Sequence, residues 1–245
     1  MKGNGDAVGK MVEKGKSQFV GPELKGKTLG VIGLGAIGIL VANAAAALGM
    51  QVIGYDPFMS VPNALRLDPS IKLMKNNEEV MTNCDYLTIH VPLTPDTKDL
   101  VDADMMAKMK DGVRILNFSR DGLVNSTAVL EALKSGKVAK YVTDFGTDDI
   151  LGEENVICLP HLGASTPESE ENCAVMACDQ VKEYLENGNI VNSVNYPAIS
   201  LPRNTKDTRF CVMHKNVPEL LKKVLSELNA NIENMLSKSR GEYAY

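Results

Sequence analysis

Long hydrophobic runs are absent from this chain of 245 residues. No apolar stretch approaches the ~20 residues that a membrane-spanning helix requires, and residues 1–6 lack the apolar core of a secretory signal peptide. We therefore expect a cytoplasmic protein that does not enter a membrane. No internal repeat or low-complexity segment is present, so the length suits one large domain or two smaller ones.

Clustered cysteines, clustered histidines and excess positive charge are also missing. The five cysteines form no Cys-x-x-Cys pair and their number is odd, which favours free thiols in a reducing compartment. His90, His161 and His214 lie far apart without ligand spacing, so we expect no metal site. A formal net charge of −5 argues against nucleic acid or an anionic membrane surface as a partner.

The most informative stretch is a glycine-rich turn between two predicted elements. Gly33, Gly35 and Gly38 form a G-x-G-x-x-G pattern after an apolar run at 28–32 that predicts a strand. The Ala- and Leu-rich residues 39–50 predict a helix, and a second apolar run at 51–55 predicts another strand. That run ends in Asp56, 18 residues past Gly38. This order of elements is typical of a unit that binds a dinucleotide.

The chemistry of dinucleotide binding explains these residue types. Gly33 allows a tight turn out of the strand, Gly35 leaves room for a pyrophosphate, and Gly38 lets helix and strand pack closely. The positive end of the helix dipole then faces the phosphates. Asp56 can accept two hydrogen bonds from a ribose diol and would repel a 2′-phosphate, so NAD is favoured over NADP. The alternative, a turn that serves only the fold, is the weaker interpretation in this context.

Further predicted strands alternate with helices along the chain. Strands are expected at 71–74, 86–91, 114–118, 140–143 and 156–159, and helices at 76–81, 102–110 and 128–135. This alternation predicts an α/β fold with a doubly wound parallel sheet. Ligands of such sheets bind beyond the carboxyl ends of the strands. We therefore expect one crevice to be lined by the residues at those ends, namely Asp56, Val91, Pro92, Ser119, Arg120, Asp144 and His161.

Two residues at these ends could carry chemistry. The planar guanidinium of Arg120 can grip a carboxylate through two hydrogen bonds, although it could equally be a surface arginine. His161 can take a proton from a hydroxyl, or it could be a structural residue beside a helix cap. A base of this kind usually has a carboxylate partner, and the spacing does not choose among Asp148, Asp149, Glu153 and Glu154. His90, inside an apolar strand, is expected to be structural.

Five motifs together resemble the D-2-hydroxyacid dehydrogenase family, most closely its branch that acts on 3-phosphoglycerate in serine biosynthesis. They are residues 24–38, 90–94, 117–122, 143–145 and 160–166. The resemblance covers residues 19–197 and implies a Rossmann fold, NAD as the cofactor, hydride transfer at C2 of a small 2-hydroxy acid, and a homo-oligomer. Glyoxylate or hydroxypyruvate as the substrate, and an NAD-binding module without turnover, are the alternatives.

The resemblance also implies roles for single residues. Arg120 would bind the substrate carboxylate and His161 would be the acid/base. The family's orienting glutamate is missing, and Asp149 is its best match, with Asp148 second. Ala36, Ile37 and Asp56 would hold the pyrophosphate and the adenosine ribose. The remaining cofactor contacts would come from Val91, Pro92, Phe118, Ser119, Arg120, Asp144, His161, Leu162, Gly163 and Ala164.

The expected organisation departs from the family at both ends. We expect an N-terminal arm at 1–27 with a short helix near 7–12, an NAD-binding domain at 28–166, a long helix at 167–188 and a linker at 189–207. Residues 208–245 resemble the start of an ACT domain, with a strand at 209–213 and a helix at 218–228. Half of the substrate domain of the family is not represented, so weak or absent turnover is expected from this chain alone.

Overall fold

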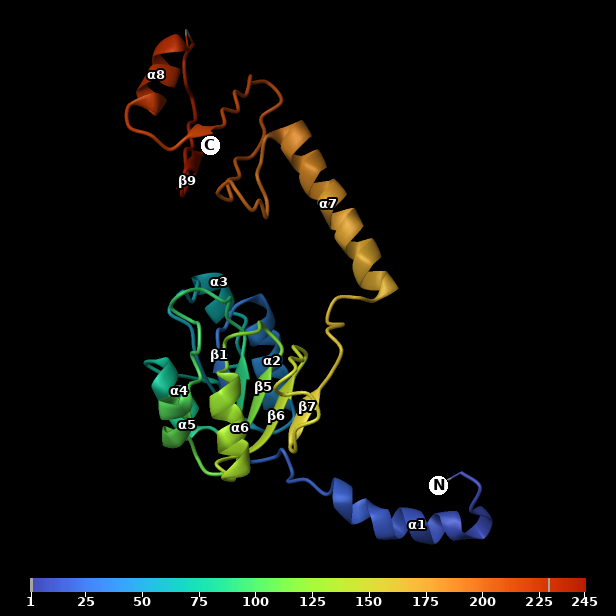
Figure 1. The fold of residues 1–245 in the computed structure, drawn as a ribbon. Coiled ribbons are helices and arrows are strands. Elements are labelled where there is room, and N and C mark those ends of the chain that lie inside the picture. The colour runs from blue at the N-terminus through green and yellow to red at the C-terminus, as the bar shows by residue number, and fades with distance from the viewer. Residues whose placement is uncertain (1, 229) are drawn as a thin grey trace. The chain divides into compact units, whose positions relative to one another are not determined.

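The computed structural model describes residues 2–228 and 230–245, which form two compact units (Figure 1). The first unit ends at His161, and the second comprises Leu162–Tyr245. No helix in the described residues is long and apolar enough to span a bilayer. The expected cytoplasmic location is not tested by that finding.

A parallel sheet of seven strands forms the centre of the first unit, counted over the described residues. Its strands are β1 (Thr28–Ile32), β2 (Gln51–Tyr55), β3 (Lys72–Leu73), β4 (Tyr86–Ile89), β5 (Val113–Asn117), β6 (Val138–Thr143) and β7 (Val156–Cys158). Their order in the sheet is β3-β2-β1-β4-β5-β6-β7. The order reverses between β1 and β4, and sheets of this kind bind their ligands beyond the carboxyl ends of the strands at such a point. The predicted doubly wound parallel sheet is thus confirmed.

Helices cover both faces of this sheet. They are α2 (Ala36–Ala47), α3 (Val61–Ala64), α4 (Asn77–Asn83), α5 (Ala103–Lys108) and α6 (Ser126–Lys134). Figure 1 shows α2 on one side of the sheet and α4, α5 and α6 on the other. The N-terminal segment carries α1 (Val8–Gly15), which confirms the expected short helix. The proline-rich residues 57–70 contain the single-turn helix α3.

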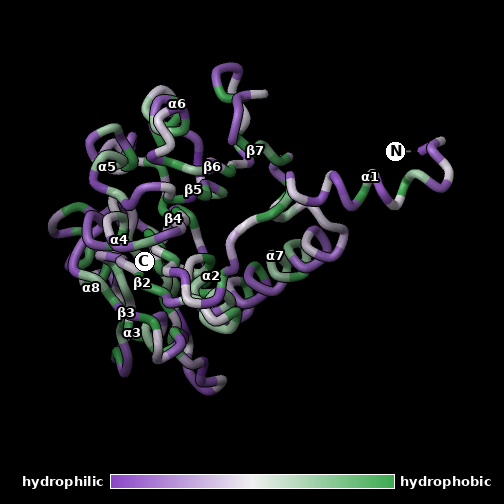
Figure 2. The backbone as a smooth tube through the Cα atoms, turned by 90° about the horizontal axis from the view of Figure 1, so that it is seen from below, coloured by the Kyte–Doolittle hydropathy of each residue, from purple (hydrophilic) through white to green (hydrophobic). Residues whose placement is uncertain are grey.

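The period of two along β1 divides the hydrophobic core into two clusters. Leu29 and Val31 point to the α2 side, where they pack with residues of that helix and of β2. Ile32 points the other way, into the cluster formed with α4, α5 and α6. Hydrophobic stretches of the strands and of α2 are green in Figure 2. The alternation explains why one short strand can bury both of its faces.

Helix α4 lies unusually close to β1, at Gly30. A Cβ on Gly30 would lie 2.8 Å from Cγ1 of Val80 and 2.9 Å from Cβ of Cys84. Glycine is therefore required here for close packing. The same burial raises the pKa of the Cys84 thiol to about 12, which makes this cysteine a core residue without thiolate chemistry at neutral pH.

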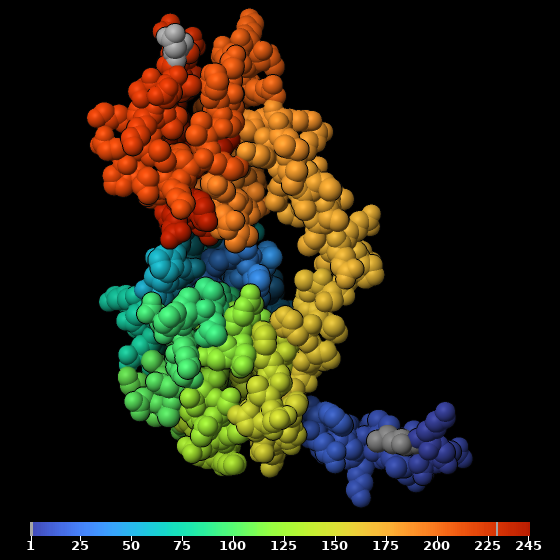
Figure 3. Space-filling model, turned by 45° about the horizontal axis from the view of Figure 1, so that its top comes forward, coloured from blue at the N-terminus to red at the C-terminus, as the bar shows by residue number. Residues whose placement is uncertain are grey.

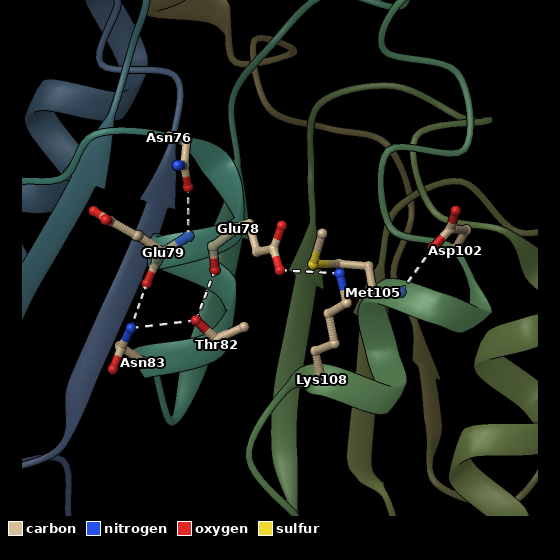
Figure 4. Close-up of polar contacts among 8 residues, drawn as sticks. All are labelled: Asn76, Glu78, Glu79, Thr82, Asn83, Asp102, Met105 and Lys108. Carbon is tan, nitrogen blue, oxygen red and sulfur yellow. Dashed lines mark hydrogen bonds and ion pairs between the residues drawn. The ribbon is translucent and has the colours of Figure 1, made fainter.

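Side-chain caps hold α4 and α5 in place (Figure 4). The Asn76 carboxamide oxygen accepts from the Glu79 amide (2.8 Å), and the Asp102 carboxylate accepts from the Met105 amide (2.8 Å). Lys108 and Glu78 join the two helices through an exposed ion pair of 2.9 Å. The caps satisfy amides that the helices leave unpaired, whereas the ion pair remains in water.

We expect Asn76→Ala to lower the free energy of unfolding by about 1 kcal/mol, because the amide at the start of α4 loses its acceptor. Lys108→Ala should leave the urea midpoint unchanged, because an exposed ion pair contributes little. Urea denaturation followed by circular dichroism measures both. Equal losses in the two variants would contradict this assignment.

The second unit starts with a long helix and ends in a small sheet. Helix α7 (Pro167–Asn187) has Thr166 as its N-cap, whose hydroxyl accepts from the Ser169 amide (3.2 Å), and Gly188 as its C-cap, with φ +70°. No residue of this fully described helix is buried, and the helix is coloured gold to orange in Figure 3. The tail contains β8 (His214–Lys215), α8 (Leu220–Glu227), β9 (Ser239–Arg240) and β10 (Tyr243–Ala244).

The prediction of a strand at 209–213 is wrong, since strand structure starts only at His214. Arg209 explains the difference. Its guanidinium donates to the Leu201 carbonyl (2.8 Å), the Pro202 carbonyl (2.9 Å) and the carbonyl of Asn187. These bonds hold the segment against residues 187–202 rather than in a sheet. The helix expected at 218–228 is confirmed by α8.

Candidate functional site

The glycine-rich turn connects β1 to α2, and its conformation requires glycine at two positions. Gly33 has φ +87°, and a Cβ there would lie 2.6 Å from the His90 carbonyl oxygen. A Cβ on Gly38 would lie 1.9 Å from the Gly33 carbonyl oxygen. The Gly33 amide donates to the Tyr55 carbonyl (2.9 Å), which ties the turn to the end of β2. Any side chain at either position would push the turn apart.

Gly35 is different, because the space beside it is open. No described atom lies within 4 Å of a Cβ built on this residue. It is the N-cap of α2 and supplies no side-chain acceptor to the first amides of the helix. Ala36 and Ile37, the next residues, are exposed. Unpaired amides, a helix N-terminus and empty space together fit a pyrophosphate group.

Asp56, at the end of β2, is held beside this turn. Its Oδ2 accepts from the Leu34 amide (2.9 Å) and its Oδ1 accepts from the Phe58 amide (2.8 Å). Each carboxylate oxygen has a second acceptor position, so both remain able to accept from the hydroxyls of a ribose. The structure therefore places Asp56 where the sequence pattern requires it.

The ends of β4 and β5 are linked by polar contacts. The Ser119 hydroxyl donates to the Val91 carbonyl (2.7 Å), and the Asn117 amide group donates to the Arg120 carbonyl (2.9 Å). The exposed Arg120 guanidinium donates to the Ser119 carbonyl (2.6 Å). No carboxylate in the described residues forms an ion pair with Arg120. Its remaining donors are thus available to an anionic group.

His161 and Asp144 meet at the ends of the neighbouring strands β6 and β7. Nδ1 of His161 lies 2.8 Å from Oδ2 of Asp144. The Asp144 side chain is 9% exposed and that of His161 is 57% exposed. The Phe145 ring lies beside the imidazole, with 4.9 Å between the ring centroids. A half-exposed histidine is therefore fixed by a nearly buried carboxylate.

This pairing differs from the expected one, in which Asp149 orients the histidine. Asp149 and Asp148 are exposed, and the Asp149 carboxylate accepts from the Thr147 hydroxyl. That hydrogen bond is the main cause that lowers the pKa of Asp149. Residues 147–151 form a turn, in which the Leu151 amide donates to the Thr147 carbonyl (3.0 Å). The turn binds Asp149 locally, so it is Asp144 that faces His161.

Sequence spacing does not identify Asp144 as the partner of His161, because the two residues lie 17 positions apart. Thr143 pairs with Cys158 across β6 and β7, and the Leu159 amide donates to the Thr143 carbonyl (2.9 Å). Residues that follow paired strands lie side by side, so strand adjacency was the available signal. Oδ1 of Asp144 is buried without a hydrogen-bond partner in the described residues. A donor on a bound molecule would satisfy it, which fits a cofactor amide at this point.

The other residues that were expected to contact the cofactor or the substrate have fewer contacts with one another. Pro92 and Phe118 are exposed, and no hydrogen bond or ion pair joins Arg120 to His161 among the described residues. Leu162, Gly163 and Ala164 follow His161 directly and belong to the second unit. The structure thus brings together the glycine turn with Asp56, the ends of β4 and β5, and Asp144 with His161.

Comparisons with known proteins agree with this geometry. The family model of the D-isomer specific 2-hydroxyacid dehydrogenase, NAD binding domain, matches residues 4–163. D-3-phosphoglycerate dehydrogenase 1 of Saccharomyces cerevisiae is 32% identical over 247 aligned residues, covering 91% of this chain and 52% of the yeast protein. D-3-phosphoglycerate dehydrogenase of Bacillus subtilis is 37% identical over 194 residues, covering 77% of this chain and 36% of that protein.

Solved structures show the same likeness. A glyoxylate reductase from Paecilomyes thermophila has a TM-score of 0.65 at 28% identity, covering 76% of this chain and 58% of that one. An NAD-complexed D-isomer specific 2-hydroxyacid dehydrogenase from Lactobacillus delbrueckii ssp. bulgaricus has a TM-score of 0.62 at 25% identity, covering 73% and 59%. The chain thus spans about half the length, or less, of the curated relatives described above. Its glycine turn, its sheet order and the family match together show that this chain belongs to the D-isomer specific 2-hydroxyacid dehydrogenases and carries their NAD-binding domain.

Proposed function

We propose that this chain belongs to an NAD-dependent oxidoreductase that moves a hydride between C2 of a small 2-hydroxy acid and nicotinamide. The observation that carries the proposal is a carboxylate-bound histidine on the sheet edge that also carries the open glycine turn. An alcohol oxidation needs a base at the hydroxyl and a hydride acceptor near the same carbon. Bound NAD supplies the hydride acceptor.

The residues of this chain would divide the remaining work. Arg120 has an exposed guanidinium without a carboxylate partner among the described residues, and it binds the substrate carboxylate. Nδ1 of His161 is directed at Asp144, so Nε2 takes the hydroxyl proton. The negative charge of Asp144 then stabilises the imidazolium that results.

The proposed substrate is D-3-phosphoglycerate, which would make the reaction a step of serine biosynthesis. The curated relatives from yeast and Bacillus subtilis that carry this name support the choice. The glyoxylate reductase among the similar structures supports glyoxylate or hydroxypyruvate as the second candidate. Both belong to one chemical class, the 2-hydroxy acids and their 2-oxo counterparts.

A steady-state assay of NADH formation with D-3-phosphoglycerate tests the proposal. We expect the weak turnover of this chain to be lost in His161→Ala, because the base is removed, and to persist in His214→Ala, a histidine outside the site. Faster reduction of glyoxylate or hydroxypyruvate would reassign the substrate. NAD binding without turnover of several 2-hydroxy acids would make this chain a cofactor-binding module instead.

Cofactor choice provides a separate prediction. Asp56→Ala should weaken NAD binding about tenfold, or roughly 1.4 kcal/mol, and narrow the preference over NADP, because the ribose loses its acceptor. Titration of NADH and NADPH by fluorescence measures both affinities. Asp68→Ala is the matched control, since among the described residues its carboxylate accepts only from Ser70. An unchanged NAD preference in Asp56→Ala would contradict the assignment.

A further inference from the structure

We propose that Asp144 is the positioning residue of His161 in this chain, and that it fixes the imidazole in the tautomer with the proton on Nδ1. The catalytic meaning of this role rests on the proposed function. The geometry of the pair does not, because it follows from the arrangement of β6 and β7.

Burial gives this contact more weight than an ordinary surface pair. The Asp144 side chain is 9% exposed, and its Oδ2 lies 2.8 Å from Nδ1 of His161. Oδ1 is buried and has no hydrogen-bond partner in the part of the chain that the structure describes. His161 is therefore the one hydrogen-bond partner of this carboxylate among the described residues. A carboxylate in a low-dielectric environment attracts an N–H donor more strongly than one in water.

The donor and acceptor chemistry then selects the tautomer. An ionised carboxylate only accepts, so a neutral imidazole at 2.8 Å must present N–H at Nδ1. A neutral ring carries one such proton, which leaves Nε2 as the acceptor. The Phe145 ring beside the imidazole, tilted at 44°, restricts its rotation. Asp144 and Phe145 together point the basic nitrogen of His161 away from the carboxylate.

The competing residue, Asp149, is engaged elsewhere. Its carboxylate accepts from the Thr147 hydroxyl inside the turn at 147–151, and its side chain is exposed. A role for Asp149 would require the turn to open and the Asp144 contact to break. The structure thus assigns to the strand-end aspartate the role that the resemblance gave to a residue five positions later.

Nitrogen-15 NMR of the histidine ring, at a pH where the imidazole is neutral, tests the proposal directly. In the native chain, we expect the His161 signals to show the proton on Nδ1. In Asp144→Asn they should move toward the Nε2–H form, because the asparagine amide can donate where the carboxylate only accepted. Asp149→Asn should leave them in place. His161→Gln identifies the signals by their loss.

Two further measurements keep the result interpretable. Asp144→Ala should also release the tautomer, and the thermal midpoint of each variant shows that the domain is folded. If turnover is present, Asp144→Asn should lower kcat about 100-fold, the scale of general base catalysis. A tautomer shift in Asp149→Asn, but not in the Asp144 variants, would overturn the proposal. The NMR result needs no turnover, so failure of the proposed function would be seen separately in the NADH assay.

Discussion

Replacing Gly38 with alanine should disrupt the nucleotide-binding turn, whereas the same change at Gly35 should keep the fold and remove cofactor affinity. A Cβ on Gly38 would lie 1.9 Å from the Gly33 carbonyl oxygen, so helix α2 would have to move away from the turn. Overpacking against backbone costs about 3 kcal/mol. A Cβ on Gly35 meets no described atom within 4 Å, and the backbone there, with φ −78°, accepts any L-residue.

The two substitutions therefore separate fold from function at one motif. Gly35→Ala should leave the free energy of unfolding nearly unchanged, because the lower entropy of the unfolded chain is offset by the poorer N-cap of α2. Its added methyl group occupies the space that a pyrophosphate needs, so NAD affinity should fall at least about tenfold, or roughly 1.4 kcal/mol. Gly38→Ala should lose stability and NAD binding together.

Urea denaturation and a fluorescence titration with NADH measure the two effects. Gly136→Ala is a control for glycine substitution, since the space beside it is also open among the described residues while its φ of +77° disfavours alanine. It should lose some stability and keep NAD affinity. A Gly35→Ala variant that binds NAD as tightly as the native chain would show that this space does not receive the cofactor.

Acidification should destabilise the first unit through His90. Burial lowers the pKa of His90 from 6.5 to about 4 in the folded chain. Its Nε2 lies 3.0 Å from the Thr88 hydroxyl, and the His90 amide donates to the Ile32 carbonyl (2.7 Å). The ring therefore remains neutral at the pH where an unfolded chain would protonate it.

The direction of the effect follows from proton counting. Between pH 6.5 and about 4, the unfolded chain binds a proton at His90 that the folded chain does not. The contribution of His90 to the free energy of unfolding is therefore fully present above pH 6.5 and is lost as the pH falls toward about 4. The total loss is about 3 kcal/mol for such a difference in pKa.

Denaturation curves of the first unit at several pH values test this prediction. His90→Gln should flatten the dependence between pH 6.5 and 4, because glutamine keeps an amide for Thr88 but does not titrate. Carboxylates also titrate near the lower limit, so the informative quantity is the difference between native and variant curves. His214→Gln, in the second unit, is the control. Parallel curves for native and His90→Gln would disprove the assignment.

Much of the predicted cofactor-binding site at the glycine-rich turn could be predicted from the order of residues in the sequence. Gly33 needs a positive φ, Gly38 needs close packing, and Asp56 follows the next strand at a set spacing. These are local requirements, so they leave a signature within about 30 residues of sequence. The strands at 28–32 and 51–55 were predicted with their observed bounds for the same reason, since short apolar runs between turns identify buried strands.

Other features depended on contacts between distant segments. The need for glycine at Gly30 comes from Val80 on α4 and from Cys84, which follows this helix directly. The strand predicted at 209–213 does not form, because Arg209 donates hydrogen bonds to carbonyls of an earlier segment. In both cases the deciding partner lies many positions away, and a local pattern contains no information about it.

The sequence by itself determined that a dinucleotide-binding turn is followed by an acidic residue, Asp56, at the end of the next strand. It also determined that Arg120 and His161 follow buried strands. Only the tertiary structure decided which carboxylate lies against His161. Spacing left four carboxylates open and the resemblance favoured Asp149, but the pairing of β6 with β7 places Asp144 2.8 Å from the ring. The physical reason is that a hydrogen bond selects the donor and acceptor that meet in space, and strand pairing, which the sequence does not state, decides where they meet.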